Sequence, residues 1–155
     1  MAYLEWKSSY DIGVDIIDHQ HRRIGDYINL LDDAIQNNEH VTVFEVMALL
    51  RDYTFDHFAF EEQLMERAGY PLLDAHMQVH SRFCARLESF SANLQTGSDP
   101  MTVARKLRNE LARWLINHIG EEDANYAALV RKAIRKEKSW VSAALDRIFG
   151  PTTTA

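Results

Sequence analysis

Apolar residues recur at spacings of three and four through most of the chain, which is the period of one face of an α-helix. In the first such stretch, Ile24, Ile28, Leu31 and Ile35 follow one another at this spacing. Glycine occurs only six times and proline only three times in 155 residues, so long stretches lack residues that interrupt a helix. The pattern therefore predicts an all-α protein without an extensive sheet.

Signals at the ends of these stretches predict four long helices. The first begins with Asp18 as its N-cap and stops in the polar run 37–39. Gly69 is expected to close the second helix in a left-handed conformation, because Pro71 cannot continue it. The later helices are expected at about residues 42–67, 71–93 and 101–120, the last continuing to residue 136. Short connections favour an up-down-up-down four-helix bundle behind an N-terminal arm.

Residues 131–149 differ from the rest of the chain, because a run of basic residues precedes an apolar set. They predict a short C-terminal amphipathic helix, followed by a disordered tail at 151–155. We therefore divide the chain into a bundle at 1–130 and a helical extension with its tail at 131–155. A solvated helix face is the simpler interpretation of the basic run, and docking of 131–149 on a membrane surface or a partner protein is the alternative.

Composition narrows the class of protein. The chain carries 23 acidic against 17 basic residues, a net charge of −6, which argues against binding nucleic acid. Its single cysteine, Cys84, cannot form an intramolecular disulfide, and no apolar stretch is long enough to span a membrane. We expect a cytoplasmic protein, soluble as a monomer.

The chemistry is concentrated in five histidines and two carboxylates. His57 and Glu61 stand four residues apart, as do His76 and His80, so each pair projects from one face of a helix. Imidazole with carboxylate suits a borderline transition metal, and iron, manganese, zinc and copper all remain open on residue type alone. The complete set of candidate ligands is His21, His57, Glu61, His76, His80, His118 and Asp123.

The last pair poses a geometric problem. His118 and Asp123 are five residues apart, which on a regular α-helix separates them by about 140°. A π-bulge near Gly120 could bring Asp123 round, and such bulges are common at functional sites. Glu122, four residues after His118, is the geometrically simpler ligand.

Four segments together resemble the hemerythrin family, specifically the bacterial hemerythrins, over about residues 4–130. They are Ile17 to His21, His57 to Glu62, Tyr70-Pro71 with His76 to His80, and Trp114 to Tyr126. The resemblance implies a pair of iron ions bridged by Glu61, Asp123 and a solvent-derived oxygen. It also implies that His76, His80 and His118 hold one iron, while His21 and His57 hold the other, which binds dioxygen.

The function that the resemblance implies is reversible dioxygen binding for storage, transport or delivery to an oxygen-consuming enzyme, without enzymatic turnover. An oxygen or redox sensor acting through a partner is the alternative, and a di-iron oxidase or peroxidase is less favoured. Gly25 stands where the resemblance would place a bulky apolar side chain. Tolerance of a glycine within the helix is the simpler interpretation, and a wider path for oxygen to the iron pair is the alternative. The expected apolar cover of the oxygen site is Ile24, Gly25, Tyr53, Leu64, Phe83, Trp114, Leu115 and Ile119.

Overall fold

The computed structural model describes residues 2–150, and helices make up most of this part of the chain. The long helices have the bounds α1 Asp15–Gln36, α2 His40–Ala68, α3 Leu73–Gln95 and α4 Pro100–His118. Two shorter ones follow, α5 Ala124–Lys136 and α6 Ser139–Phe149. A π-helical segment at Ile119–Asp123 joins α4 to α5.

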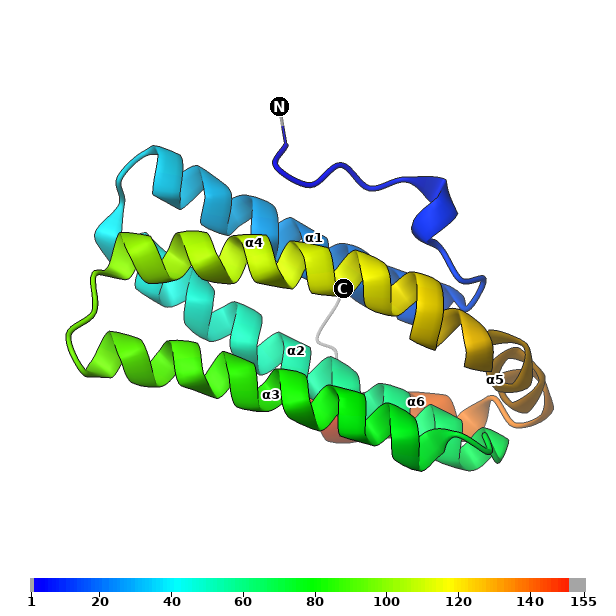
Figure 1. Cartoon of the computed structure of the whole chain (residues 1–155). Helices are drawn as coiled ribbons and strands as arrows, with labels where there is room; N and C mark the ends of the chain where they lie inside the picture. Colours follow the sequence, from blue (N-terminus) through cyan, green and yellow to red (C-terminus); the bar gives the residue numbers. More distant parts are fainter. Residues whose placement is uncertain (1, 151–155) are drawn as a thin grey trace.

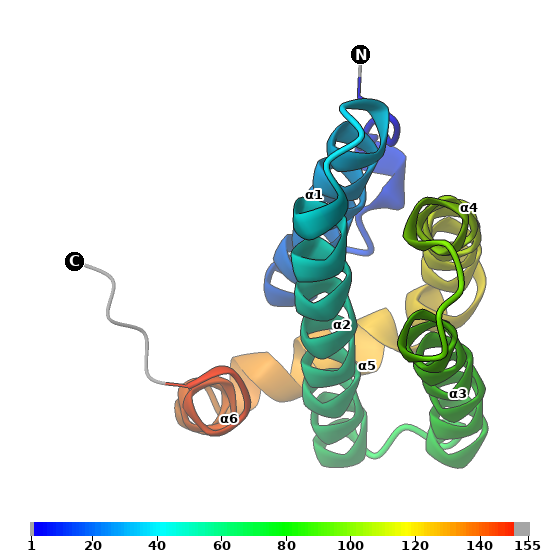
Figure 2. The ribbon, with the colours of Figure 1, turned by 90° about the vertical axis from the view of Figure 1, so that its left-hand side faces the viewer.

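Helices α1 to α4 alternate in direction along the bundle (Figure 1). Helices α1 and α3 each pack on α2 and α4, and α2 and α4 also contact each other across the bundle; Figure 2 shows the bundle from the end. The expected all-α up-down-up-down bundle is therefore confirmed. Among residues 2–150, every helix is too short or too polar to serve as a membrane span.

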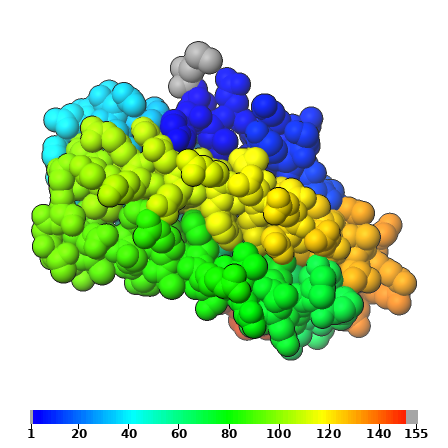
Figure 3. Space-filling model, viewed as in Figure 1, coloured from blue at the N-terminus to red at the C-terminus, as the bar shows by residue number. Residues whose placement is uncertain are grey.

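The N-terminal arm is fixed along the bundle over α1 and α4 (Figure 3). The backbone of Leu4 exchanges two hydrogen bonds with the Asn29 side chain of α1, at 2.8 and 2.9 Å. The Tyr3 hydroxyl donates to Asn109 Oδ1 of α4 at 2.6 Å. These bonds tie an irregular segment to two helices that the bundle already holds together.

The start of α1 differs from the prediction. The helix begins at Asp15, three residues before the expected cap, so Asp18 is not the N-cap. Its buried carboxylate instead accepts the backbone N–H groups of Ile12 and Gly13, which fixes the turn between the arm and the helix. The expected left-handed end of α2 is confirmed, because Gly69 has φ 69° and its N–H bonds back to the carbonyl of Glu66.

Beyond the π-helical segment the chain turns away from the axis of α4. Helix α5 crosses the end of the bundle and α6 returns along the outside of α2 (Figure 2). The apolar side of α6 is used in this packing, since Val141 and Ala144 are buried. The expected division at residue 130 falls inside α5, and the tail at 151–155 lies outside the described residues.

The buried apolar side chains form two clusters. The large cluster fills the bundle around Ile28, Leu50 and Leu111. The small cluster lies towards α5 and α6 around Phe60 and Val130. Between them, each of the four bundle helices carries polar side chains inward.

Candidate metal centre

A layer of buried polar side chains separates the two apolar clusters. On α2, His57 and Glu61 lie on either side of Phe58, which belongs to the large cluster, and Phe60, which belongs to the small one. The same change of cluster occurs near His21 on α1 and near Asp123 after α4. All seven candidate ligands are at most 4% exposed: His21, His57, Glu61, His76, His80, His118 and Asp123.

The seven side chains converge as two overlapping groups, within each of which the donor atoms lie within 4.8 Å of one another. One group contains His76, His80 and His118, and the other contains His21 and His57. Glu61 and Asp123 belong to both groups. The arrangement thus provides three imidazoles on one side, two on the other, and two shared carboxylates between them.

Each shared carboxylate divides its oxygens between the groups. Glu61 Oε1 lies 2.9 Å from His76 Nε2, while its Oε2 lies 3.0 Å from His57 Nε2. Asp123 Oδ1 lies 2.9 Å from His118 Nε2, while its Oδ2 lies 3.0 Å from His21 Nε2. A carboxylate oriented in this way can place one oxygen on each of two cations.

Several of these buried atoms approach one another without the geometry of a hydrogen bond. His21 Nε2, Glu61 Oε2 and both Asp123 oxygens have no hydrogen-bond partner among the described residues. Unpaired buried polar groups are costly, so the convergence requires a further occupant. Imidazole nitrogens and carboxylate oxygens around two adjacent positions fit a pair of transition-metal ions.

Without metal, the two carboxylates of the cluster favour the protonated form of several imidazoles that face them. Burial lowers the pKa of His21, but Asp123 and Glu61 outweigh it and raise the value to about 9. The same balance raises the pKa of His76 to about 10 and that of His118 to about 8. Burial opposes ionisation of Glu61, yet the facing imidazoles hold its pKa well below the usual range. A metal must displace these protons, so its affinity should rise with pH.

Asp123 reaches the centre through the π-helical segment Ile119–Asp123. The wider turn adds one residue to the helix, so the fifth residue after His118 falls on the inner face. Asp123 is fully buried, whereas Glu122 is half-buried and lines a groove between α3 and α4. The structure therefore brings Asp123 into the cluster by the expected π-bulge, and Glu122 stays outside it.

Two side chains that sequence reasoning did not single out bind the outer nitrogens of the imidazoles. His57 Nδ1 lies 2.7 Å from Gln20 Oε1, and His80 Nδ1 lies 2.9 Å from Glu62 Oε2. Both partners are acceptors, so Nδ1 donates and the Nε2 lone pair points into the centre. Each partner adjoins a candidate ligand in sequence, and that adjacency was the only available signal.

Aromatic rings cover the three-histidine group. Phe58 stacks on His80 with ring centroids 3.9 Å apart, and Trp114 stacks on His118 at 4.3 Å. Phe83 stacks in turn on Trp114 at 4.1 Å. Trp114 and Phe83 were expected at the oxygen site of the two-histidine group, but Trp114 lies against His118 of the three-histidine group and Phe83 lies against Trp114. Phe58 was not singled out from the sequence, although it follows His57 directly.

The other residues of the expected oxygen pocket lie on different sides of the centre. Ile24, Leu115 and Ile119 are buried in the large cluster, and Tyr53 packs against its edge. Leu64 belongs to the small cluster. Gly25 faces the N-terminal arm, where an added Cβ would lie 3.5 Å from Leu4 and 3.7 Å from Trp6. The arm thus covers the side of Gly25 that its sequence position suggested as an oxygen path.

The remaining histidines and the cysteine lie outside the cluster. His19 on α1 and His40 at the start of α2 are exposed. Cys84 is half-buried, and burial together with Glu62 and Glu88 raises the pKa of its thiol to about 11. Its sulfur therefore stays protonated near neutral pH, which suits a small apolar side chain better than a ligand.

Comparison with known proteins agrees with this geometry. Residues 12–130 match a family model described as Hemerythrin HHE cation binding domain. The chain belongs to the hemerythrin family. Bacteriohemerythrin from Pseudomonas paraeruginosa is 42% identical to this hemerythrin-family chain over 156 residues, covering 97% of the chain and all of the relative.

More distant members of the hemerythrin family align over a shorter range. Myohemerythrin from Riftia pachyptila is 31% identical over 78% of this chain and 88% of its own length. A crystal structure of wild-type hemerythrin superposes with a TM-score of 0.73 at 26% identity, covering 83% of this chain and 98% of that chain. These two alignments cover about four fifths of this chain, so α6 can lie outside the bundle that the three proteins have in common.

Proposed function

We propose that this protein binds dioxygen reversibly at a non-haem di-iron centre. The observation that supports this most directly is the division of Glu61 and Asp123 between a three-histidine and a two-histidine group. Two bridging carboxylates with three and two imidazoles leave the two-histidine side short of one ligand. When bound there, the iron pair would supply the electrons for reversible uptake of oxygen.

In this proposal each side chain has a defined role. His76, His80 and His118 hold one iron, and His21 and His57 hold the other. Glu61 and Asp123 bridge the two ions. Gln20 and Glu62 orient His57 and His80 through their outer nitrogens.

The apolar surroundings serve binding rather than turnover. Ile24 and Leu115 are at most 1% exposed, and Phe58 is 3% exposed, so the layer is shielded from bulk water. Excluding water and proton donors protects a reactive bound molecule from onward reaction. We therefore propose a cytoplasmic, non-enzymatic carrier that stores oxygen or delivers it to an oxygen-consuming enzyme.

The test is an absorption spectrum of the iron-loaded, anaerobically reduced protein before oxygen, after oxygen and after purging with inert gas. A charge-transfer band should appear with oxygen and vanish on purging. His21→Ala should abolish the band, and the matched control His19→Ala, at an exposed position two residues earlier, should retain it. A one-way conversion to a stable oxidised form would instead indicate a redox sensor or an oxidase.

A further inference from the structure

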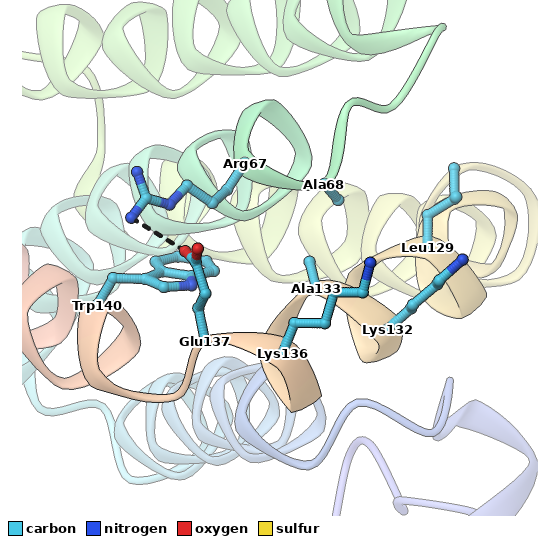
Figure 4. A pocket seen from close by; sticks show the side chains of 8 residues that line it. All are labelled: Arg67, Ala68, Leu129, Lys132, Ala133, Lys136, Glu137 and Trp140. Atoms are coloured by element: carbon cyan, nitrogen blue, oxygen red, sulfur yellow. Dashed lines mark ion pairs between the residues drawn. The ribbon is translucent and has the colours of Figure 1, made fainter.

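A groove lies where the end of α2 meets α5 and α6, away from the metal centre (Figure 4). Its volume is about 540 Å³, which is within the range of small-molecule sites. The groove includes Arg67 from α2, Lys132 and Lys136 from α5, and Trp140 from α6. Three separate helices therefore build one concave surface.

The charge of this groove is opposite to that of the whole molecule. The chain has a net charge of −6, yet three cationic side chains line the groove against one carboxylate, Glu137. Lys132 and Lys136 stand one helical turn apart on the same face of α5, a spacing at which like charges repel. An anion bound between them would remove that repulsion.

The acidic side chain in the groove is only loosely engaged. Glu137 pairs with Arg67 at 3.4 Å, but the two side chains are 63% and 54% exposed, so the pair contributes little. A ligand with more negative charge than one carboxylate would compete successfully for the Arg67 guanidinium. The Arg67 guanidinium also lies 5.1 Å from the centre of the Trp140 ring.

The groove also offers apolar surface. Leu129 is 40% exposed, and Ala133 adds a second apolar wall. A ligand that satisfies all of these features carries phosphate at one end and an apolar or planar group at the other.

The geometry disfavours a membrane surface as the binding partner. A helix that lies on lipid needs a free apolar face, and α6 has buried Val141 and Ala144 against the bundle. The three cations belong to α2 and α5 and line a concave surface, whose shape matches a small soluble anion better than a flat bilayer.

We propose that this groove binds a small organic polyphosphate of the nucleoside diphosphate type. Lys132 and Lys136 hold the adjacent phosphates, and Arg67 leaves Glu137 to join them. The organic portion lies against Leu129 and Ala133. The proposal is independent of the oxygen-binding function, because no metal ligand lines the groove.

The experiment is calorimetric titration of the metal-loaded full chain with ADP at about 150 mM salt, where screening suppresses non-specific attraction. ADP should bind, and Lys132→Ala with Lys136→Ala should weaken it at least about ten-fold. Arg105→Ala with Lys106→Ala removes the same charge from an exposed part of α4 and should leave the affinity within about two-fold. Metal content is measured before and after each titration.

Four outcomes would overturn the proposal. No binding of ADP at millimolar concentration would exclude the site, and equal weakening by both double variants would reduce it to non-specific attraction. If inorganic pyrophosphate bound as tightly as ADP, the organic portion of the ligand would contribute nothing to binding. Vesicles of phosphatidylglycerol that co-sediment with the protein, when ADP does not bind, would make the surface a lipid contact.

Discussion

At the scale of single residues, the orientation of the imidazoles depends on side chains outside the candidate ligand set. His80 Nδ1 donates to Glu62 and His57 Nδ1 donates to Gln20, which leaves both Nε2 atoms free to point inward. The helical period predicted that His57 and His80 each share a helix face with another candidate ligand, but it did not predict the whole set, because it favoured Glu122 over Asp123. It also could not predict these two hydrogen-bond acceptors, because each contacts a histidine on a neighbouring helix.

Glu62→Ala should weaken iron binding by about ten- to a hundred-fold, because His80 loses the acceptor that fixes its tautomer. Competition with a chelator measures the change. Glu66→Ala, on an exposed position of the same helix, is the matched control and should retain iron as the parent protein does. Equal losses in the two variants would mean that Glu62 acts only through the charge of α2.

At the scale of elements, the π-helical segment decides which acidic residue enters the centre. Regular helical geometry favoured Glu122, and only the irregular turn at Ile119–Asp123 places Asp123 inside. The sequence indicated that an irregularity was possible near Gly120. The sequence could not establish that this irregularity is present, because a π-helical turn depends on tertiary contacts that stabilise the inward-pointing carboxylate.

Asp123→Ala should reduce iron below two ions per chain, since it removes an oxygen from each group. Glu122→Ala should keep the full iron content, because that side chain faces the outer groove. Metal analysis of both variants after identical loading gives the comparison. Full iron content in Asp123→Ala would mean that another carboxylate bridges the two ions.

The end of α2 gives a second prediction at this scale. Gly69→Ala should destabilise the protein by about 1 kcal/mol, or about 2–4 °C in Tm, because φ 69° strains any residue with a Cβ. Gly120→Ala meets no atom within 4 Å and φ there is not positive, so Tm should be unchanged or slightly higher. Thermal unfolding of the two variants separates backbone strain from packing. Equal shifts would argue against the left-handed cap as the cause.

At the scale of the whole molecule, the order and direction of the four long helices followed from sequence period and helix ends. The placement of α5 and α6 did not, because their amphipathic pattern fits packing on the bundle as well as docking on a membrane. In the structure Val141 and Ala144 are buried, so this face of α6 packs on the bundle. The basic groove was equally unpredictable, since Arg67 and Lys136 are far apart in the sequence.

The polar layer between the two apolar clusters has a consequence for the dynamics of the metal-free protein. Helices ordinarily fray from their ends, yet here buried polar atoms without hydrogen-bond partners lie in the middle of the bundle, between two apolar regions. After chelation, amide hydrogen exchange should therefore accelerate first around residues 57–61 and 118–123, while Leu50 and Val130 stay protected. Uniform acceleration along α2 would contradict this. If the prediction holds, loss of metal opens the middle of the bundle and leaves two separate folded regions that are joined by continuous helices.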